Sequence, residues 1–167
     1  MARRSSPLGA RRLILDASVA VKWFLRDEVL DSEAQLVREA LLEDRIRASA
    51  PSIIWSEVAH AVVGAVRRSR LEREDANDIS ARFPFARRIV DLKEVAIDEA
   101  IHRALSAGVS AYDAQYLSLT ARLGQSLVTA DRRLVEKGTA GGYDVVWLGD
   151  VTLRDGVLVD TPQGYQG

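Results

Sequence analysis

Four acidic residues stand out because of where they lie relative to apolar segments. Asp16 and Asp131 each follow directly after a short apolar run of the kind that forms a buried strand. Glu57 and Asp113 lie within segments that have helical patterns. Carboxylates act as general acids and bases, and they bind hard divalent cations. An acid embedded in apolar sequence is costly to bury alone, so each of these needs a partner.

Each acid also has a purely structural explanation. Asp16 and Asp131 are placed to cap the helices that follow them. Asp113 lies in the first turn of its helix, where the macrodipole favours an anion. Glu57 is explained equally well by a bond to an arginine or a backbone amide. For any one acid these explanations compete with a catalytic role, so the hypothesis of a site depends on the four acids converging.

Convergence of the acids would require a cation. Three or four carboxylates in one cleft repel each other unless a positive charge neutralises them. The sequence has no cysteine and only two histidines, so the available ligands are hard oxygens, which suit Mg²⁺ or Mn²⁺. Such ions activate water and stabilise the leaving oxygen of a phosphodiester. The acids therefore suggest a metal-dependent nuclease.

The elements that must position these acids alternate between short apolar runs and amphipathic segments. Strands are expected at 13–15, 46–50, 89–92, 126–130 and 145–148. Helices are expected at 19–25, 33–43, 52–68, 72–83, 98–108 and 110–123, with Pro84 stopping the fourth. Strands separated by helices imply right-handed crossovers, which predicts an α/β fold: a three-layer α/β/α domain with a mainly parallel five-stranded sheet. Ligands bind outside the carboxyl ends of such strands, where Asp16 and Asp131 lie.

Length and charge pattern predict one domain with two distinct ends. The chain has 167 residues, and domains of about 150 residues are typical. We expect a flexible basic leader at 1–11, the domain at 12–149, and a tail at 150–167. Within the tail, two alternating segments flank Asp155-Gly156, a pair typical of a type I′ hairpin turn.

Composition excludes several classes of protein. The absence of cysteine rules out a disulfide scaffold and a thiolate zinc site. No stretch approaches the roughly 20 apolar residues that a membrane span requires, and the opening residues lack the apolar core of a secretory signal. We therefore expect a cytoplasmic protein. The net charge is −1, but basic residues exceed acidic ones over residues 67–93, which predicts either a solvated helix face or a basic surface.

Four segments resemble the motifs of a known family, the PIN-domain ribonucleases, and most closely the VapC toxins of toxin–antitoxin pairs. The segments are LILDASVAVKWF at 13–24, IWSEVA at 54–59, SAYDAQYL at 110–117 and LVTADRRL at 127–134. Their order and spacing agree over about residues 12–149. The last two segments are the most specific.

The resemblance implies a PIN fold and magnesium-dependent cleavage of RNA. It makes all four acids the catalytic and metal-binding pocket, either directly or through water on the metal: Asp16, Glu57, Asp113 and Asp131. Ser18 and Thr129 become supporting hydroxyls that orient the ligands.

Partners are implied in the same way. The family suggests a homodimer that is held inactive by a cognate VapB-like antitoxin, whose tail enters the cleft. The basic residues of 67–93 would then guide RNA phosphates toward a groove of the dimer. The basic leader and the C-terminal hairpin depart from the family pattern.

Two alternatives remain open from the sequence. A PIN-like fold that binds RNA or a partner without turnover is one, although the presence of all four acids weighs against it. The other is a di-iron protein, because Glu57-Val-Ala-His60 and Glu99-Ala-Ile-His102 both have the Glu-x-x-His spacing of di-iron bundles. Such a bundle needs four long helices, and this sequence predicts short ones.

Overall fold

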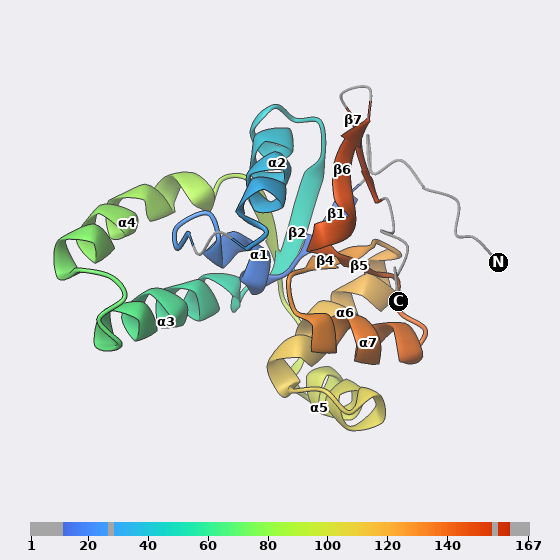
Figure 1. Cartoon of the computed structure of the whole chain (residues 1–167). Coiled ribbons are helices and arrows are strands. Elements are labelled where there is room, and N and C mark those ends of the chain that lie inside the picture. Colours follow the sequence, from blue (N-terminus) through green and yellow to red (C-terminus); the bar gives the residue numbers. More distant parts are fainter. Residues whose placement is uncertain (1–11, 27–28, 155–156, 161–167) are drawn as a thin grey trace, which may run out of the picture.

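The structure is a computed structural model that describes residues 12–26, 29–154 and 157–160. Its centre is a parallel five-stranded sheet in the order β3-β2-β1-β4-β5 (Figure 1). The strands are β1 (Arg12–Leu15), β2 (Arg47–Pro51), β3 (Val90–Lys93), β4 (Leu127–Thr129) and β5 (Val145–Trp147). The α/β fold with a parallel five-stranded sheet is therefore confirmed.

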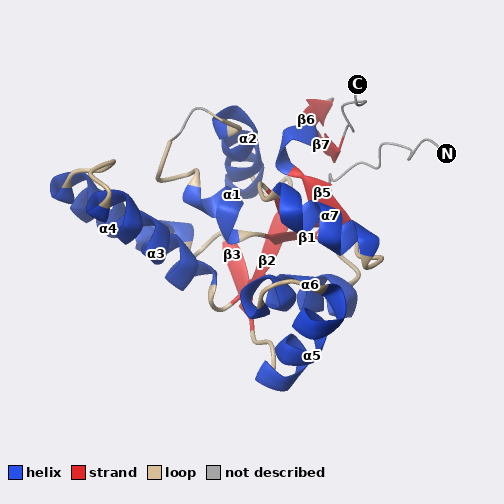
Figure 2. Ribbon diagram, turned by 60° about the horizontal axis from the view of Figure 1, so that its bottom comes forward, coloured by secondary structure: helices blue, strands red, loops and turns tan. Residues whose placement is uncertain are grey.

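Helices cover both faces of this sheet. They are α1 (Ala17–Val21), α2 (Asp31–Leu42), α3 (Ile54–Arg67), α4 (Arg73–Ala86), α5 (Ile97–Ala107), α6 (Ala111–Leu123) and α7 (Arg132–Ala140). On one face α6 packs across β1, β2 and β4, α5 packs on α6, and α7 packs on β4 and β5. Figure 2 shows α1 and α2 on the other side of the sheet, with α3 and α4 side by side at its edge. None of the described helices combines the length and apolar composition needed to cross a bilayer.

Strand β1 is the centre of the core because its side chains are apolar on both faces. Leu13, Ile14 and Leu15 are all fully buried, as expected for a central strand covered by helices on each side. Leu15 lies beside Val128 of β4 in the parallel register. The residues that follow these two strands therefore emerge next to each other at one edge of the sheet.

The order of the strands makes this edge a switch point. From β1 the chain proceeds outward through β2 to β3, and it then returns to the other side of β1 for β4 and β5. Connections therefore leave the ends of β1 and β4 in opposite directions, which opens a crevice between them where ligands of parallel sheets bind. Asp16 and Thr129 lie at this crevice.

Helix α4 corrects one expectation from the sequence. We expected Pro84 to end the helix, but α4 continues to Ala86. Proline removes one hydrogen bond here, in the last turn, and the N–H of Arg87 still reaches the carbonyl of Phe83 at 3.1 Å. The Phe83 ring stacks on Phe24 with centroids 5.0 Å apart, so tertiary packing holds the turn that proline alone would weaken.

The C-terminal segment forms the expected antiparallel pair. After a short 3₁₀ turn, η1 (Leu148–Asp150), strand β6 (Val151–Arg154) pairs with β7 (Val157–Asp160). The expected type I′ turn at residues 155–156 and the expected basic leader at 1–11 lie outside the described residues.

Candidate active site

Asp16 is held by one of its two carboxylate oxygens. Its Oδ2 accepts hydrogen bonds from the Thr129 hydroxyl at 2.8 Å, from the Ser18 backbone N–H at 3.2 Å, and from the Ser18 hydroxyl. The hydrogen bonds between described residues leave Oδ1 without a donor. The residue is only 6% exposed, so one oxygen is fixed by three donors while the other has no protein partner among the described residues.

Ser18 and Thr129 join the ends of β1 and β4. Their hydroxyl oxygens lie 3.3 Å apart. The Ser18 hydroxyl accepts the N–H of Ala130 at 2.9 Å, and the Thr129 hydroxyl accepts the N–H of Asp131 at 3.0 Å. Both hydroxyls thus donate to Asp16 while they accept from the turn after β4, which fixes the orientation of the carboxylate.

Glu57 is anchored by a residue whose part in the site the sequence did not reveal. The hydroxyl of Tyr116 donates to Glu57 Oε2 at 2.6 Å and joins helix α6 to helix α3. Tyr116 is fully buried, and burial raises the pKa of its hydroxyl, so it stays protonated and remains a donor. It lies one helical turn after Asp113, a spacing that places both side chains on one face of α6; that spacing is the signal that could have identified it.

The pKa values of Asp16 and Glu57 are raised by burial and by neighbouring negative charges. Burial raises the pKa of Asp16, and the charge of Asp113 adds to this effect, against the hydrogen bonds from Ser18 and Thr129, which lower it. Burial also raises the pKa of Glu57 to about 7, and the charges of Asp16 and Asp113 add to the increase. The structure therefore brings Asp16, Glu57 and Asp113 into one neighbourhood of negative potential.

Asp131 has a different environment. It is the N-cap of α7, and its Oδ1 accepts the N–H groups of Arg133 at 2.8 Å and Leu134 at 3.3 Å. The neighbouring charges that raise the pKa values of Asp16 and Glu57 do not include Asp131. The capping role that the sequence offered as an alternative is therefore present. Like Asp16, Asp131 uses one oxygen for the fold, and its Oδ2 accepts nothing from the described part of the chain.

The donor set fits a divalent metal in its chemistry. Carboxylate and hydroxyl oxygens are hard ligands, which suit Mg²⁺ or Mn²⁺, and a cation would offset the repulsion among Asp16, Glu57 and Asp113. Across residues 12–26, 29–154 and 157–160, no group of three His, Cys, Asp or Glu side chains is gathered at coordinating distance.

The Glu-x-x-His pairs do not assemble into a second site. Glu99 forms ion pairs with Arg103 at 3.4 Å and with Arg122 at 3.9 Å. His60 and His102 are exposed on α3 and α5. The di-iron interpretation requires both pairs to face one centre, and Figure 1 shows α3 and α5 on separate parts of the molecule.

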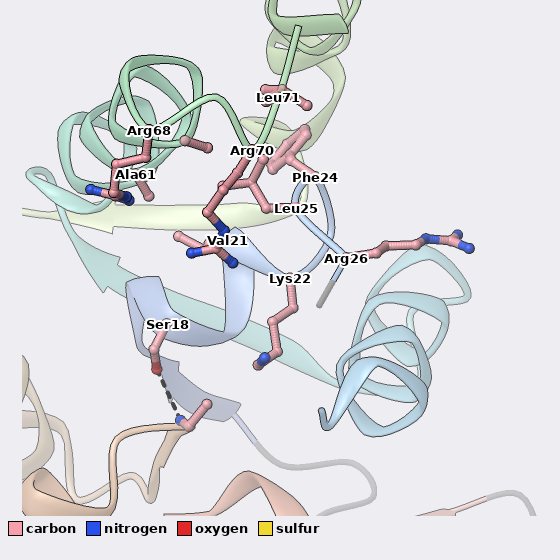
Figure 3. Close-up of a pocket in the computed structure, with 12 residues that line it drawn as sticks. Ser18, Val21, Lys22, Phe24, Leu25, Arg26, Ala61, Arg68, Arg70 and Leu71 are labelled. Carbon is pink, nitrogen blue, oxygen red and sulfur yellow. Dashed lines mark hydrogen bonds between the residues drawn. The ribbon is translucent and has the colours of Figure 1, made fainter. Parts of the chain in front are cut away.

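Two pockets border the acids and meet at Ala61. One, of about 490 Å³, is lined by Glu57, His60 and the exposed Tyr112. The other, of about 410 Å³, is lined by Ser18 and Ala130 at the strand ends and extends toward the C-terminus of α3 (Figure 3). Together they provide space for a ligand longer than a single small molecule beside Asp16 and Glu57.

The parallel sheet and the acids at its switch point agree with the result of comparing the sequence with known families. The PIN domain family matches residues 13–139, and the chain belongs to this family.

Among its relatives is "Ribonuclease VapC3" from Pyrobaculum aerophilum, which is 29% identical over 128 residues, 75% of this chain and 94% of the relative. A solved structure from Pyrobaculum aerophilum superposes with a TM-score of 0.61 at 21% identity, covering 83% of this chain and 90% of that one. A toxin–antitoxin complex from Klebsiella pneumoniae superposes with a TM-score of 0.53 at 18% identity, covering 80% and 95%.

Proposed function

We propose that the protein is a Mg²⁺- or Mn²⁺-dependent endoribonuclease of the VapC type. The observation that carries the proposal is that Asp16 and Glu57, at the switch point of the sheet, lie close enough to Asp113 for its charge to raise the pKa of both. Membership of the PIN domain family supports it, as does the relative named "Ribonuclease VapC3". The substrate class is RNA, and the reaction is hydrolysis of a phosphodiester.

In this proposal Asp16, through its free Oδ1, and Asp113, from the first turn of α6, would hold the ion. Glu57 and Asp131 would act on it through water. A bound divalent ion would supply a Lewis acid for the phosphate and a more acidic water molecule. Ser18 and Thr129 keep Asp16 in one orientation, so its free oxygen is already positioned when substrate arrives.

Glu57 is the group in this site best suited to accept a proton. In the metal-free protein its pKa is raised to about 7, near the pH at which a general base is most effective. In the proposed reaction the oxygen of a water molecule attacks the phosphorus, and Glu57 takes the proton released. The bond from phosphorus to the leaving ribose oxygen breaks, and that oxygen takes a proton from solvent water. Tyr116 holds Oε2 of Glu57, so Oε1 is the oxygen that meets the water.

Regulation by partners belongs to the same proposal. Solved structures of this fold include a toxin–antitoxin complex, which supports an antitoxin as partner. We propose a cytoplasmic homodimer that a VapB-like antitoxin keeps inactive. The antitoxin would present a tail that enters the cleft beside Asp16. A short basic DNA-binding protein encoded by the adjacent reading frame, and its co-purification with this chain, would test this part.

Induced expression followed by mapping of RNA ends tests the activity itself. New RNA ends are expected with the wild-type chain and not with Asp16→Asn. A chain that binds RNA but produces no new ends with Mg²⁺ or Mn²⁺ would instead be a non-catalytic PIN-like binding module, and the proposed reaction would be wrong.

A further inference from the structure

The pocket beside Ser18 is strongly basic. Its described lining includes four cations, Lys22, Arg26, Arg68 and Arg70, and no acid. Its volume of about 410 Å³ lies within the roughly 300–1,000 Å³ range of ligand pockets. A basic pocket thus adjoins the acidic cluster.

Two of the four cations are not directed at a ligand in the pocket. The Lys22 amine donates to the carbonyl of Val29 at 2.7 Å, and the residue is only 8% exposed, so it ties down the loop after α1. Arg26 points away from the pocket in Figure 3. Arg68 and Arg70 are the cations that remain for a ligand.

Arg68 and Arg70 are held over the pocket without a charged partner. Both are exposed, and neither forms an ion pair with any residue that the structure describes. Figure 3 shows the guanidinium of Arg70 extending toward Val21 and that of Arg68 lying near Ala61. A Cβ atom at Gly64 would lie only 3.1 Å from Nη1 and Nη2 of Arg68, so the glycine leaves room for the guanidinium at this position.

Stabilisation of the end of α3 does not account for this arrangement. Cations near a helix C-terminus interact favourably with its carbonyls, and Arg67 in the last turn of α3 already provides one. Arg67 is exposed and is not among the residues that line the pocket. Helix stability therefore gives no reason for two further arginines to lie over the pocket beside Ser18.

We propose that Arg68 and Arg70 bind backbone phosphates of the RNA strand next to the phosphate that is cleaved. The inference rests on the proposed function, because it takes RNA as the substrate. Guanidinium groups match phosphate oxygens through two parallel N–H donors, and such contacts position a strand without reading its sequence. The basic run 67–93 predicted from the sequence thus contributes to this pocket through Arg68 and Arg70, while Arg87 lines a separate pocket between α3 and α4.

The test is RNA binding as a function of salt, measured by fluorescence anisotropy on the full chain. The probe is a labelled single-stranded RNA of mixed sequence, with chelator present so that no cleavage occurs. Each phosphate contact to a single strand contributes about 0.7 to the slope of log Kd against log salt. The double variant R68A/R70A should therefore lower that slope by about 1.4, whereas R68K/R70K should keep most of it. The matched control is R67A, which should leave it unchanged.

A second substrate, a dinucleoside monophosphate, distinguishes binding in the basic pocket from binding at the cleavage site. It carries only the phosphate to be cleaved, so R68A/R70A should bind it, and cleave it with metal, as the wild-type protein does. If R68A/R70A keeps the wild-type salt slope, or R67A lowers the slope as much, the pocket does not bind phosphate. In either case a wild-type protein that cuts RNA leaves the proposed function intact. A wild-type protein that neither binds nor cuts RNA contradicts both.

Discussion

The hydroxyl of Tyr116 donates to Glu57 Oε2 at 2.6 Å across 59 positions of the sequence. This bond fixes one oxygen of a carboxylate whose pKa is raised to about 7 mainly by burial, and it opposes that increase. Tyr116 therefore both orients Glu57 and keeps it ionised at a lower pH than burial alone would allow.

Removal of this hydroxyl should move the pH dependence of cleavage. In Tyr116→Phe the bond that lowers the pKa of Glu57 is lost, so that pKa rises further. The acidic limb of the pH–rate profile should shift to higher pH, and the fold should lose about 1–3 kcal/mol, the cost of leaving a charged acceptor without its donor. The matched control is Tyr112→Phe, since Tyr112 is 61% exposed. If the acidic limb of the pH–rate profile stays at the same pH in Tyr116→Phe, Tyr116 does not influence the group that titrates.

Ionisation of Glu57 should lower the free energy of unfolding of the metal-free protein as the pH rises. The pKa of Glu57 is raised from 4.5 to about 7 in the fold, so between these values the folded state binds more protons than the unfolded state, and stability falls with rising pH. Glu57→Gln mimics the protonated form and keeps an acceptor for Tyr116. The melting temperatures of wild type and E57Q should agree near pH 4.5 and diverge toward pH 7, with E57Q higher. If the wild type melts at a higher temperature than E57Q near neutral pH, ionised Glu57 stabilises the fold and the prediction is wrong.

Asp16→Asn should separate stability from activity. Burial disfavours the charged form of Asp16 and raises its pKa, while an asparagine oxygen still accepts from Thr129 and Ser18. The metal-free variant should therefore melt higher than wild type, by about 2–4 °C for each kcal/mol gained, and should no longer cleave RNA. A variant that is less stable and still active would contradict both statements.

Two substitutions distinguish the roles of Asp131. Asparagine caps a helix about as well as aspartate, whereas alanine costs about 1 kcal/mol at this position. Asp131→Asn should keep the stability of the fold and slow cleavage, though less than substitution of Asp113, because Asp131 acts through water. Asp131→Ala should show the same slowing together with a lower melting temperature. If Asp131→Asn cleaves RNA at the wild-type rate, Asp131 is a helix cap only.

Local patterns in the sequence predicted the elements that carry the acids. The apolar run before Asp16 required a strand buried on both faces, and β1 is such a strand. Ser110 was expected to cap the helix that contains Asp113, and its hydroxyl accepts the N–H of Asp113 at 3.0 Å. Such features depend on neighbouring residues, so they can be read without knowledge of the fold.

Relationships between distant segments could not be predicted in this way. The pairing of β1 with β4 depends on which strands become neighbours, and it decides that Thr129 reaches Asp16. The backbone after β4 decides that Oδ1 of Asp131, and not Oδ2, accepts the N–H groups at the start of α7. The helix through Pro84 depends on the stacking of Phe83 on Phe24, which outweighs a local rule about proline.

The central claim is that Asp16 and Asp113 hold a divalent ion beside Glu57, and that this site cleaves RNA. Asp113→Asn tests it most directly, because Asp113 is half-buried and its side chain accepts no hydrogen bond in the part of the chain that the structure describes. The measurement is the rate of RNA cleavage with Mg²⁺ by wild type and D113N, with melting temperatures to show that both are folded. We expect cleavage by wild type that chelator abolishes, and a loss of at least about 100-fold in D113N, the size of effect that a positioned catalytic group usually contributes. A folded D113N that cuts RNA at the wild-type rate, or a wild type that cuts equally well in chelator, would contradict the account.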